Sequence, residues 1–130
     1  MEDSREVARM GLKEYLEKLT EPLEELETER IRSICLAVPG VTPIVEIEPR
    51  NRYKIAGLVR NMRIEPKKYG TILEITVTDG TGLAKARWTG RARIPGIDVS
   101  KYIVLEGHAT TAPDGSLVFI NPFYELLYVE

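Results

Sequence analysis

The sequence predicts a mainly β protein, a five-stranded antiparallel barrel preceded by two short N-terminal α-helices. Apolar residues recur at three- and four-residue spacing as far as about residue 35, which is typical of amphipathic helices. Beyond residue 53 they alternate with polar residues, which is typical of half-buried strands. Prolines and a glycine between residues 39 and 50 separate the two patterns. A chain of 130 residues, 43% of them hydrophobic, suits one domain with an appendage.

The N-terminal part is expected to form two helices. The first covers residues 4–19, and the second begins where Thr20 can cap it, with Pro22 in the first turn. Each has an apolar stripe, made by Leu12, Tyr15, Leu16 and Leu19 in the first helix and by Leu23, Leu26, Ile31, Ile34 and Cys35 in the second. The stripes must be buried on each other, on the barrel or on a partner. Cys35, the single cysteine, is predicted to be a buried structural thiol.

Residues 39–50 are expected to form an extended connector, after which five strands follow. The strands are Tyr53–Ile64, Thr71–Thr78, Leu83–Thr89, Tyr102–Thr110 and Leu117–Tyr124. Gly57 marks a bend in the long first strand, and Asp79-Gly80 and Pro113-Asp114-Gly115 supply turns. Pro95 and Gly96 predict a loop or a single turn at 90–100 rather than a long helix. The order fits an OB-fold. An SH3-like barrel is the alternative, but it does not predict so long a third-to-fourth connection.

Charge divides the chain into an acidic part and a basic part. Residues 1–49 have six Lys and Arg against twelve Asp and Glu, a net charge of −6. Residues 50–130 have twelve against eight, a net charge of +4. The predicted domains are therefore an acidic helical arm and linker at 1–49 and an OB-fold barrel at 50–130. The plainer alternative is that a glutamate-rich helix has a solvated face.

Five short segments of the chain resemble a known family. They are Ile55-Ala56-Gly57-Leu58-Val59, Thr78-Asp79-Gly80-Thr81-Gly82, Trp88-Thr89-Gly90-Arg91, Ile94-Pro95-Gly96-Ile97 and Asn121-Pro122-Phe123-Tyr124-Glu125-Leu126. With them, residues 20–128 resemble small actinobacterial OB-fold nucleic-acid-binding proteins, which are similar to the anticodon-binding barrel of aminoacyl-tRNA synthetases and to the wedge barrel of the RecG helicase. The resemblance implies nucleic-acid binding, although a fold alone does not establish a function.

Basic residues of the barrel region are the candidate nucleic-acid-binding residues. An OB barrel binds single strands across strands two and three, where cations contact phosphates and flat side chains stack on bases. Lys85 and Arg87 share one face of strand three, with Thr76 and Thr78 beside them on strand two. Two rims complete the predicted site, one formed by Arg60, Arg63, Lys67, Lys68 and Tyr69 and the other by Arg91 and Arg93. The alternative is that Lys85 and Arg87 are merely solvated strand residues.

Aromatic residues give a weaker signal for base stacking. Trp88 alternates with Lys85 and Arg87, so it is predicted to face the core, unless a bulge near Gly90 reverses it. Tyr69, in a loop, is the expected exposed stacking residue. At least two of Phe119, Phe123 and Tyr124 are expected in the core.

No enzyme, cofactor or metal is expected. The single histidine, His108, has no second histidine or cysteine at ligand spacing and is read as a plain strand residue. Glu65, Glu74 and Asp79 are too scattered for a carboxylate pair. Gly80-Thr81-Gly82 lacks the lysine of a phosphate loop. Without a signal pattern or a long apolar span, a cytoplasmic location is expected.

Two functions therefore remain open. The first is a non-catalytic module that binds single-stranded DNA or RNA, or structured RNA, with low sequence specificity. The second is a protein-interaction or self-association module that uses the acidic N-terminal helices. A mixed case is also open, in which those helices cover the basic face.

Overall fold

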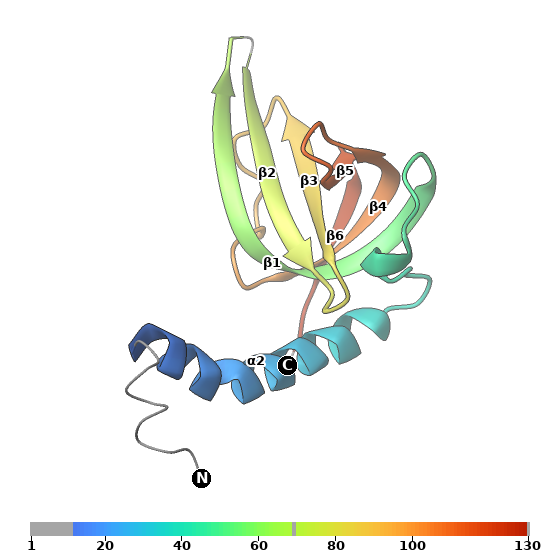
Figure 1. Cartoon of the computed structure of the whole chain (residues 1–130). Coiled ribbons are helices and arrows are strands. Elements are labelled where there is room, and N and C mark those ends of the chain that lie inside the picture. The colour runs from blue at the N-terminus through green and yellow to red at the C-terminus, as the bar shows by residue number, and fades with distance from the viewer. Residues whose placement is uncertain (1–11, 69, 130) are drawn as a thin grey trace.

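In the computed structural model, β-strands curl into a barrel and a long helix lies beneath it (Figure 1). The structure describes residues 12–68 and 70–129, with helix side chains from Glu24 onward. The elements in this range are α2 (Leu12–Leu36), the 3₁₀ turn η1 (Ile44–Glu46), β1 (Arg52–Lys67), β2 (Gly70–Thr78), β3 (Leu83–Thr89), β4 (Tyr102–Thr111), β5 (Leu117–Ile120) and β6 (Phe123–Leu127). The mainly β prediction is confirmed. The described connector contains η1 and is otherwise irregular.

The described part of the chain has one helix where the sequence predicted two. α2 continues through Thr20 and Pro22, the predicted boundary. Pro22 lacks an N–H, so the helix loses one bond there. Leu-, Glu- and Lys-rich sequence on both sides favours helix strongly enough to continue it. The rest of the predicted first helix, residues 4–11, lies outside the described residues.

β1 is the strand that joins the two halves of the barrel. Its residues 52–58 pair with β4 and residues 58–67 pair with β2, both antiparallel. Gly57 lies where the strand changes partners, and a Cβ there would come within 2.8 Å of the Val77 Cβ. Glycine is therefore required by close packing against β2 at the predicted bend. A register shift between Val59 and Asn61 adds a bulge just beyond it.

The C-terminal end of the barrel departs from the five-strand prediction. Asn121, with φ of 47°, and Pro122 divide the expected last strand into β5 and β6. Proline cannot donate a ladder hydrogen bond, so the strand ends there. β5 pairs parallel with β3 over Lys85–Arg87 only, so the closure is uneven and not entirely antiparallel. The connection from β3 to β4 is a loop, as predicted.

Two apolar clusters hold the fold together. The larger fills the barrel and includes Trp88 and Phe119, together with Ile44 from the connector. In the smaller, Ile31 and Cys35 of α2 pack on Ala56, Leu58 and Val104 on the outer side of β1 and β4. Cys35 is 0% exposed, which confirms a buried thiol, and burial raises its pKa to about 12. The second half of α2 is therefore fastened to the barrel.

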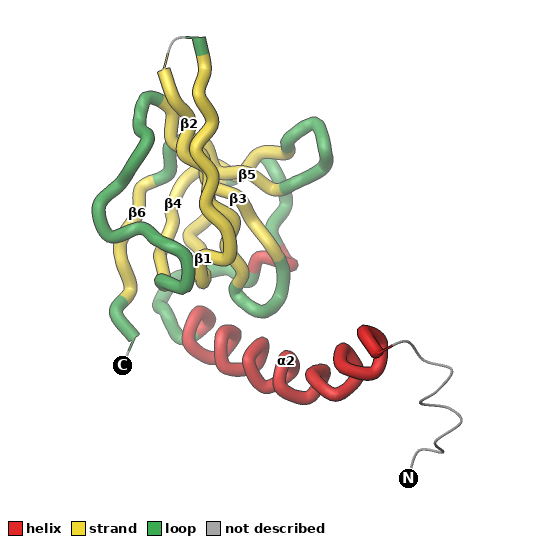
Figure 2. Tube along the Cα trace, turned by 90° about the vertical axis from the view of Figure 1, so that its left-hand side faces the viewer, coloured by secondary structure: helices red, strands yellow, loops and turns green. Residues whose placement is uncertain are grey.

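Both views show the helix below the barrel, with its N-terminal half extending beyond it (Figures 1 and 2). Leu26 precedes Ile31, the first buried residue among the described helix side chains, and is 63% exposed. No helix in the described residues is long and apolar enough to cross a membrane.

Candidate nucleic-acid interface

The outer face of β2 and β3 brings together the central residues of the predicted site. In the antiparallel register Glu74 lies opposite Arg87, and Thr76 lies opposite Lys85. The inward residues between them, such as Ala84, Ala86 and Trp88, are buried in the barrel. Lys85 and Arg87 therefore share the solvent side of β3, as predicted, with Thr76 beside them.

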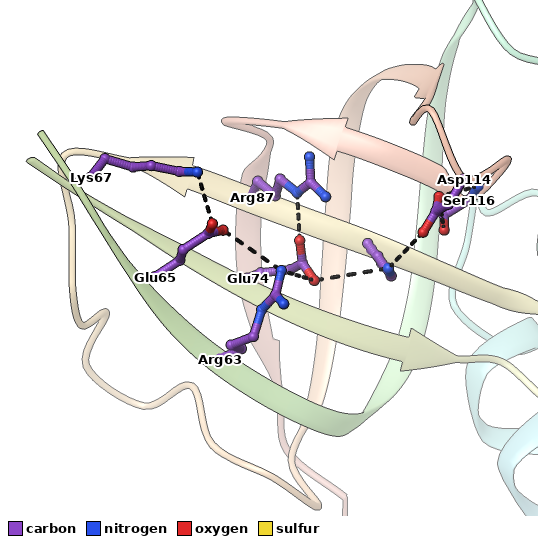
Figure 3. Close-up of polar contacts among 8 residues, drawn as sticks. Arg63, Glu65, Lys67, Glu74, Arg87, Asp114 and Ser116 are labelled. Carbon is purple, nitrogen blue, oxygen red and sulfur yellow. Dashed lines mark hydrogen bonds and ion pairs between the residues drawn. The ribbon is translucent and has the colours of Figure 1, made fainter.

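Glu74 lies at the centre of this face and is shared by three cations. It is only 6% exposed, although its side chain is on the outer side of the sheet. Arg87 donates to it through Nε, Arg63 approaches it at 3.5 Å, and Lys85 lies 4.0 Å away (Figure 3). A carboxylate that is nearly buried is stable only when cations or donors satisfy it. The cations that cover Glu74 are thus also those predicted to contact a ligand.

Two more carboxylates lie at the edges of the same charged cluster. Glu65 pairs with Lys67 at 2.7 Å and with Arg63 at 3.7 Å. At the opposite edge Asp114 lies 3.6 Å from Lys85. The Ser116 hydroxyl and amide donate to Asp114 and lower the pKa of its carboxyl to about 2. We call the seven charged residues Arg63, Glu65, Lys67, Glu74, Lys85, Arg87 and Asp114 the ladder cluster. Four cations and three carboxylates give it a net charge of +1.

The other predicted residues are not members of the ladder cluster. Arg60, at the β1 bulge, turns to the helix and pairs with Glu27 at 3.4 Å. Arg91 and Arg93 are exposed in the loop after β3. Lys68 is exposed at the end of the β1–β2 hairpin, and Tyr69 lies outside the described residues. Of the predicted set, the structure therefore unites Arg63, Lys67, Lys85 and Arg87.

Exposed aromatic side chains lie on a different part of the barrel. Trp88 is 4% exposed, donates to the Pro122 carbonyl at 3.1 Å and meets Tyr124 edge to face, which confirms the core prediction. Phe119 is buried, but Phe123 is 73% and Tyr124 is 39% exposed. The expectation that at least two of these three lie in the core is therefore wrong. The turn at Asn121-Pro122 redirects the chain, and Phe123 comes out opposite Glu106, with Arg52 over its ring.

The β2–β3 face has aliphatic rather than aromatic apolar contacts to offer. Leu83 is 64% exposed on β3, and Ile120 of β5 lies opposite Arg87 and is 47% exposed. Sequence reasoning missed these two residues and the carboxylates of Glu74 and Asp114. The available signal was alternation, since Glu74 falls on the same side of its strand as Thr76.

Helix α2 meets the barrel at other places. Its Arg32 donates to the Gly80 carbonyl at 3.2 Å, and its Glu27 pairs with Arg60. These contacts lie at the β2–β3 turn and on β1. Among the described residues, Lys85 forms ion pairs with Glu74 and Asp114 rather than with the helix. The described part of α2 therefore leaves the ladder cluster open, unlike the mixed case in which helices cover it.

Candidate catalytic groups do not converge in the described residues. His108 is exposed on β4, opposite Arg52. Asp79 is buried at the turn, where Ile44 N, Thr81 N, Thr81 Oγ1 and Gly82 N donate to its carboxylate. No cluster of three or more His, Cys, Asp or Glu suited to a metal ion occurs within residues 12–68 and 70–129.

No protein-family model and no curated protein matches the sequence. Among solved structures, the OB domain of MM0293 from Methanosarcina mazei is similar with a TM-score of 0.56 and 18% identity, over 70% of this chain and 86% of that one. The barrel has the OB fold. RecG bound to a three-way DNA junction matches over 69% of this chain with a TM-score of 0.53 and 14% identity. Schizosaccharomyces pombe Pot1pC bound to ssDNA matches over 69% of this chain and 88% of its own, with a TM-score of 0.51 and 13% identity.

The OB barrel of this chain corresponds to only a small part of RecG, because the match spans 13% of the RecG chain. Identities of this size show a shared fold, and they do not show a shared ligand.

Proposed function

We propose that the protein is a non-catalytic OB-fold module that binds single-stranded DNA or RNA on the outer face of β2 and β3. RNA stays among the candidate ligands because DNA and RNA strands both present phosphates to the cations of this face. Residues 50–130 form the binding module, and residues 1–49 form an acidic helical arm and linker. The residues proposed to contact the strand are Arg60, Arg63, Lys67, Lys68, Tyr69, Lys85, Arg87, Arg91 and Arg93.

The observation that carries this proposal is the convergence of Arg63, Lys85 and Arg87 on one open sheet face of an OB barrel. Each arginine has five N–H donors in a fixed fork, and contact with Glu74 uses only some of them. The remaining donors can contact phosphate oxygens while Glu74 holds the side chains in place. Preordered cations lose less conformational freedom on binding.

The same network explains why binding is expected to be weak and tolerant of sequence. The ladder cluster has a net charge of only +1, so a phosphate competes with three carboxylates for its cations. Contacts to phosphates orient a strand but do not read its bases. Exposed Leu83 and Ile120 offer apolar contact to bases without the stacking that an aromatic ring would give.

Fluorescence anisotropy with labelled oligonucleotides tests the proposal. Binding of a single strand should weaken with salt, with a slope of about −0.7 in log K against log salt for each phosphate neutralised. We expect a total slope near −2, corresponding to about three phosphates. Absence of binding to both DNA and RNA at low salt would contradict the proposal.

A second function, protein interaction or self-association through the helix, is favoured by one observation. α2 has 25 residues, but its buried contacts begin at Ile31, and Leu26 is 63% exposed. The N-terminal half extends beyond the barrel (Figure 2). The exposed Leu26 side chain on this half of the helix is therefore available to a partner or a second copy.

Light scattering after size exclusion distinguishes this second function. A Leu26→Glu variant removes an exposed apolar residue and leaves Ile31 and Cys35 on the barrel. Self-association through α2 predicts a dimer for the native chain and a monomer for the variant. If both are monomeric, self-association is excluded, and the helix serves the barrel or a different partner.

A further inference from the structure

A cavity of about 420 Å³ lies on the helix side of the barrel, away from the ladder cluster. It is formed where α2, the loop before β4 and the end of β6 meet. Its walls include Arg30 of α2, Lys101 just before β4, Tyr102 at the start of β4, and Leu127 and Tyr128 at the C-terminal end. A cavity of this size is within the range that holds a small organic ligand.

Two cations face this cavity without the carboxylates that occupy the ladder cluster. Arg30 and Lys101 line it, and its lining contains neither Asp nor Glu. Neither side chain forms an ion pair with another described residue. Besides burial, the negative charge of Glu27 acts on the Tyr102 hydroxyl and raises its pKa. This carboxylate is already paired with Arg60, however, at 3.4 Å. The cavity therefore has positive charge that is free to attract an anion.

Two tyrosines give the same cavity flat apolar walls. Tyr102 is half-buried, and burial raises the pKa of its hydroxyl, which keeps it a neutral donor. Tyr128 is 87% exposed, so its ring can turn toward a ligand without losing contacts. Leu127 also lines the cavity and adds an aliphatic surface. The cavity thus combines aromatic rings with cations that form no ion pair. Among the described residues, the β2–β3 face lacks this combination.

We propose that this cavity binds a nucleotide, with its phosphate at Arg30 and Lys101 and its base against Tyr102 and Tyr128. Arginine offers a planar pair of donors that matches a phosphate, and lysine adds a second positive charge. A base can stack on a tyrosine ring whatever its identity. The nucleotide can be a free monophosphate or the phosphorylated end of a strand, because both present the same chemistry. This site is separate from the proposed strand-binding face.

Amide chemical shifts of the ¹⁵N-labelled full chain test this site directly. Adenosine 5′-monophosphate is the probe, with adenosine and inorganic phosphate as the two half-ligands. We expect saturable shifts at Gly96, Ser100 and Lys101, with a dissociation constant of about 1 mM or below. Each half-ligand should bind at least about tenfold more weakly than the nucleotide. Unchanged spectra at about 10 mM nucleotide, or shifts confined to Lys85 and Arg87, would overturn the proposal.

Variants separate charge from stacking in the same titration. Arg30→Gln and Lys101→Gln should each weaken nucleotide binding about fivefold, and Tyr128→Ala about threefold. Lys54→Gln, which removes a cation of β1 that belongs to neither proposed site, is the matched control and should change it less than twofold. Equal losses in all four variants would show a non-specific charge effect and reject the site.

Two octathymidylates identify the source of the nucleotide, one with a 5′-phosphate and one with a 5′-hydroxyl. With the monophosphate bound, cavity shifts with the phosphorylated strand but not with the hydroxyl strand indicate that a strand end can occupy the site. Shifts with the free monophosphate and with neither strand indicate a free nucleotide. Shifts at Lys85 with the hydroxyl strand report the proposed strand-binding face instead. The two proposals therefore succeed or fail on different amides.

Discussion

The two outer faces of the barrel differ in how their side chains are stabilised. On the outer side of β2 and β3, Glu74, Lys85, Arg87 and the neighbouring Arg63 form an ion-pair network open to solvent. On the lower part of β1 and β4, the outer residues Ala56, Leu58 and Val104 are apolar and are buried by α2. One face is satisfied by ion pairs and the other by a helix.

This difference shows which part of the molecule is available to a ligand. Removing α2 would expose an apolar patch, so the second half of the helix belongs structurally to the barrel. Rearranging the ladder cluster exposes no apolar core, because its side chains lie above an intact sheet. A strand can therefore contact the ladder cluster without unfolding anything, and the cost is competition with carboxylates.

The largest expected effect is on the covered face. Ile31→Ala removes a side chain that is 2% exposed between α2 and the barrel, and should lower the free energy of unfolding by about 3 kcal/mol. Urea denaturation measures it. Leu26→Ala is the matched control in the same helix, with an expected change within about 0.5 kcal/mol. Similar small effects for both would mean that α2 is not part of the folded barrel.

Asp79→Ala should cost slightly less, about 2 kcal/mol of unfolding free energy. The substitution leaves the donors of Ile44, Thr81 and Gly82 without their carboxylate. Because Ile44 N is one of them, the connector should loosen together with the turn. Asp98→Ala is the control, since the exposed Asp98 carboxylate accepts only from the Val99 amide among described residues. Native-state amide exchange at Ile44 that stays slow in Asp79→Ala would count against this bond.

A smaller effect on ligand binding is expected on the open face. Glu74→Gln removes one negative charge from the ladder cluster and should raise the affinity for a single-stranded oligonucleotide about fivefold at low salt. Glu125→Gln on β6 changes the net charge of the protein equally and should alter affinity less than about twofold. Anisotropy titrations compare the two. A loss of affinity in Glu74→Gln, with stability unchanged, would show that the positioning of the arginines by Glu74 outweighs its competition with phosphate.

The smallest effect concerns Asp114. Its folded-state pKa is about 2, below the ordinary value of 3.8, because Ser116 donates to the ionised form. Its stabilising contribution should therefore be present above pH 4 and disappear as pH falls toward 2. Denaturation of the native chain and of Asp114→Asn should differ slightly at pH 6 and converge near pH 2. A difference that grows on acidification would contradict the lowered pKa.

The sequence was sufficient to predict the fold where the spacing of apolar residues and the turn-forming residues agree. Alternation placed Lys85 and Arg87 outside and Trp88 inside, and Gly57 and Asp79-Gly80 fell at the bend and the turn. The prediction failed where the neighbouring sequence overrode a local signal. Thr20 and Pro22 look like a helix start, but strong helix formers on both sides carry α2 through them.

The candidate site was harder to predict because the spacing of residues along the chain does not show which residues face one another on neighbouring strands. Glu74 meets Arg63 and Arg87 only through the register of three strands. The bulge beyond Val59 turns Arg60 toward Glu27 instead of the ladder cluster. The exposed position of Phe123 depends on the backbone at Asn121, where φ is 47°.

Strand binding by two double variants of equal charge tests the central proposal most directly. Lys85→Gln with Arg87→Gln removes two cations from the open face, and Arg52→Gln with Lys54→Gln removes two from β1 where it pairs with β4. Anisotropy at low salt should show a loss of about tenfold or more for the first pair and about twofold or less for the second. Equal losses for the two pairs, or no binding by the native chain, would contradict the assignment of the β2–β3 face.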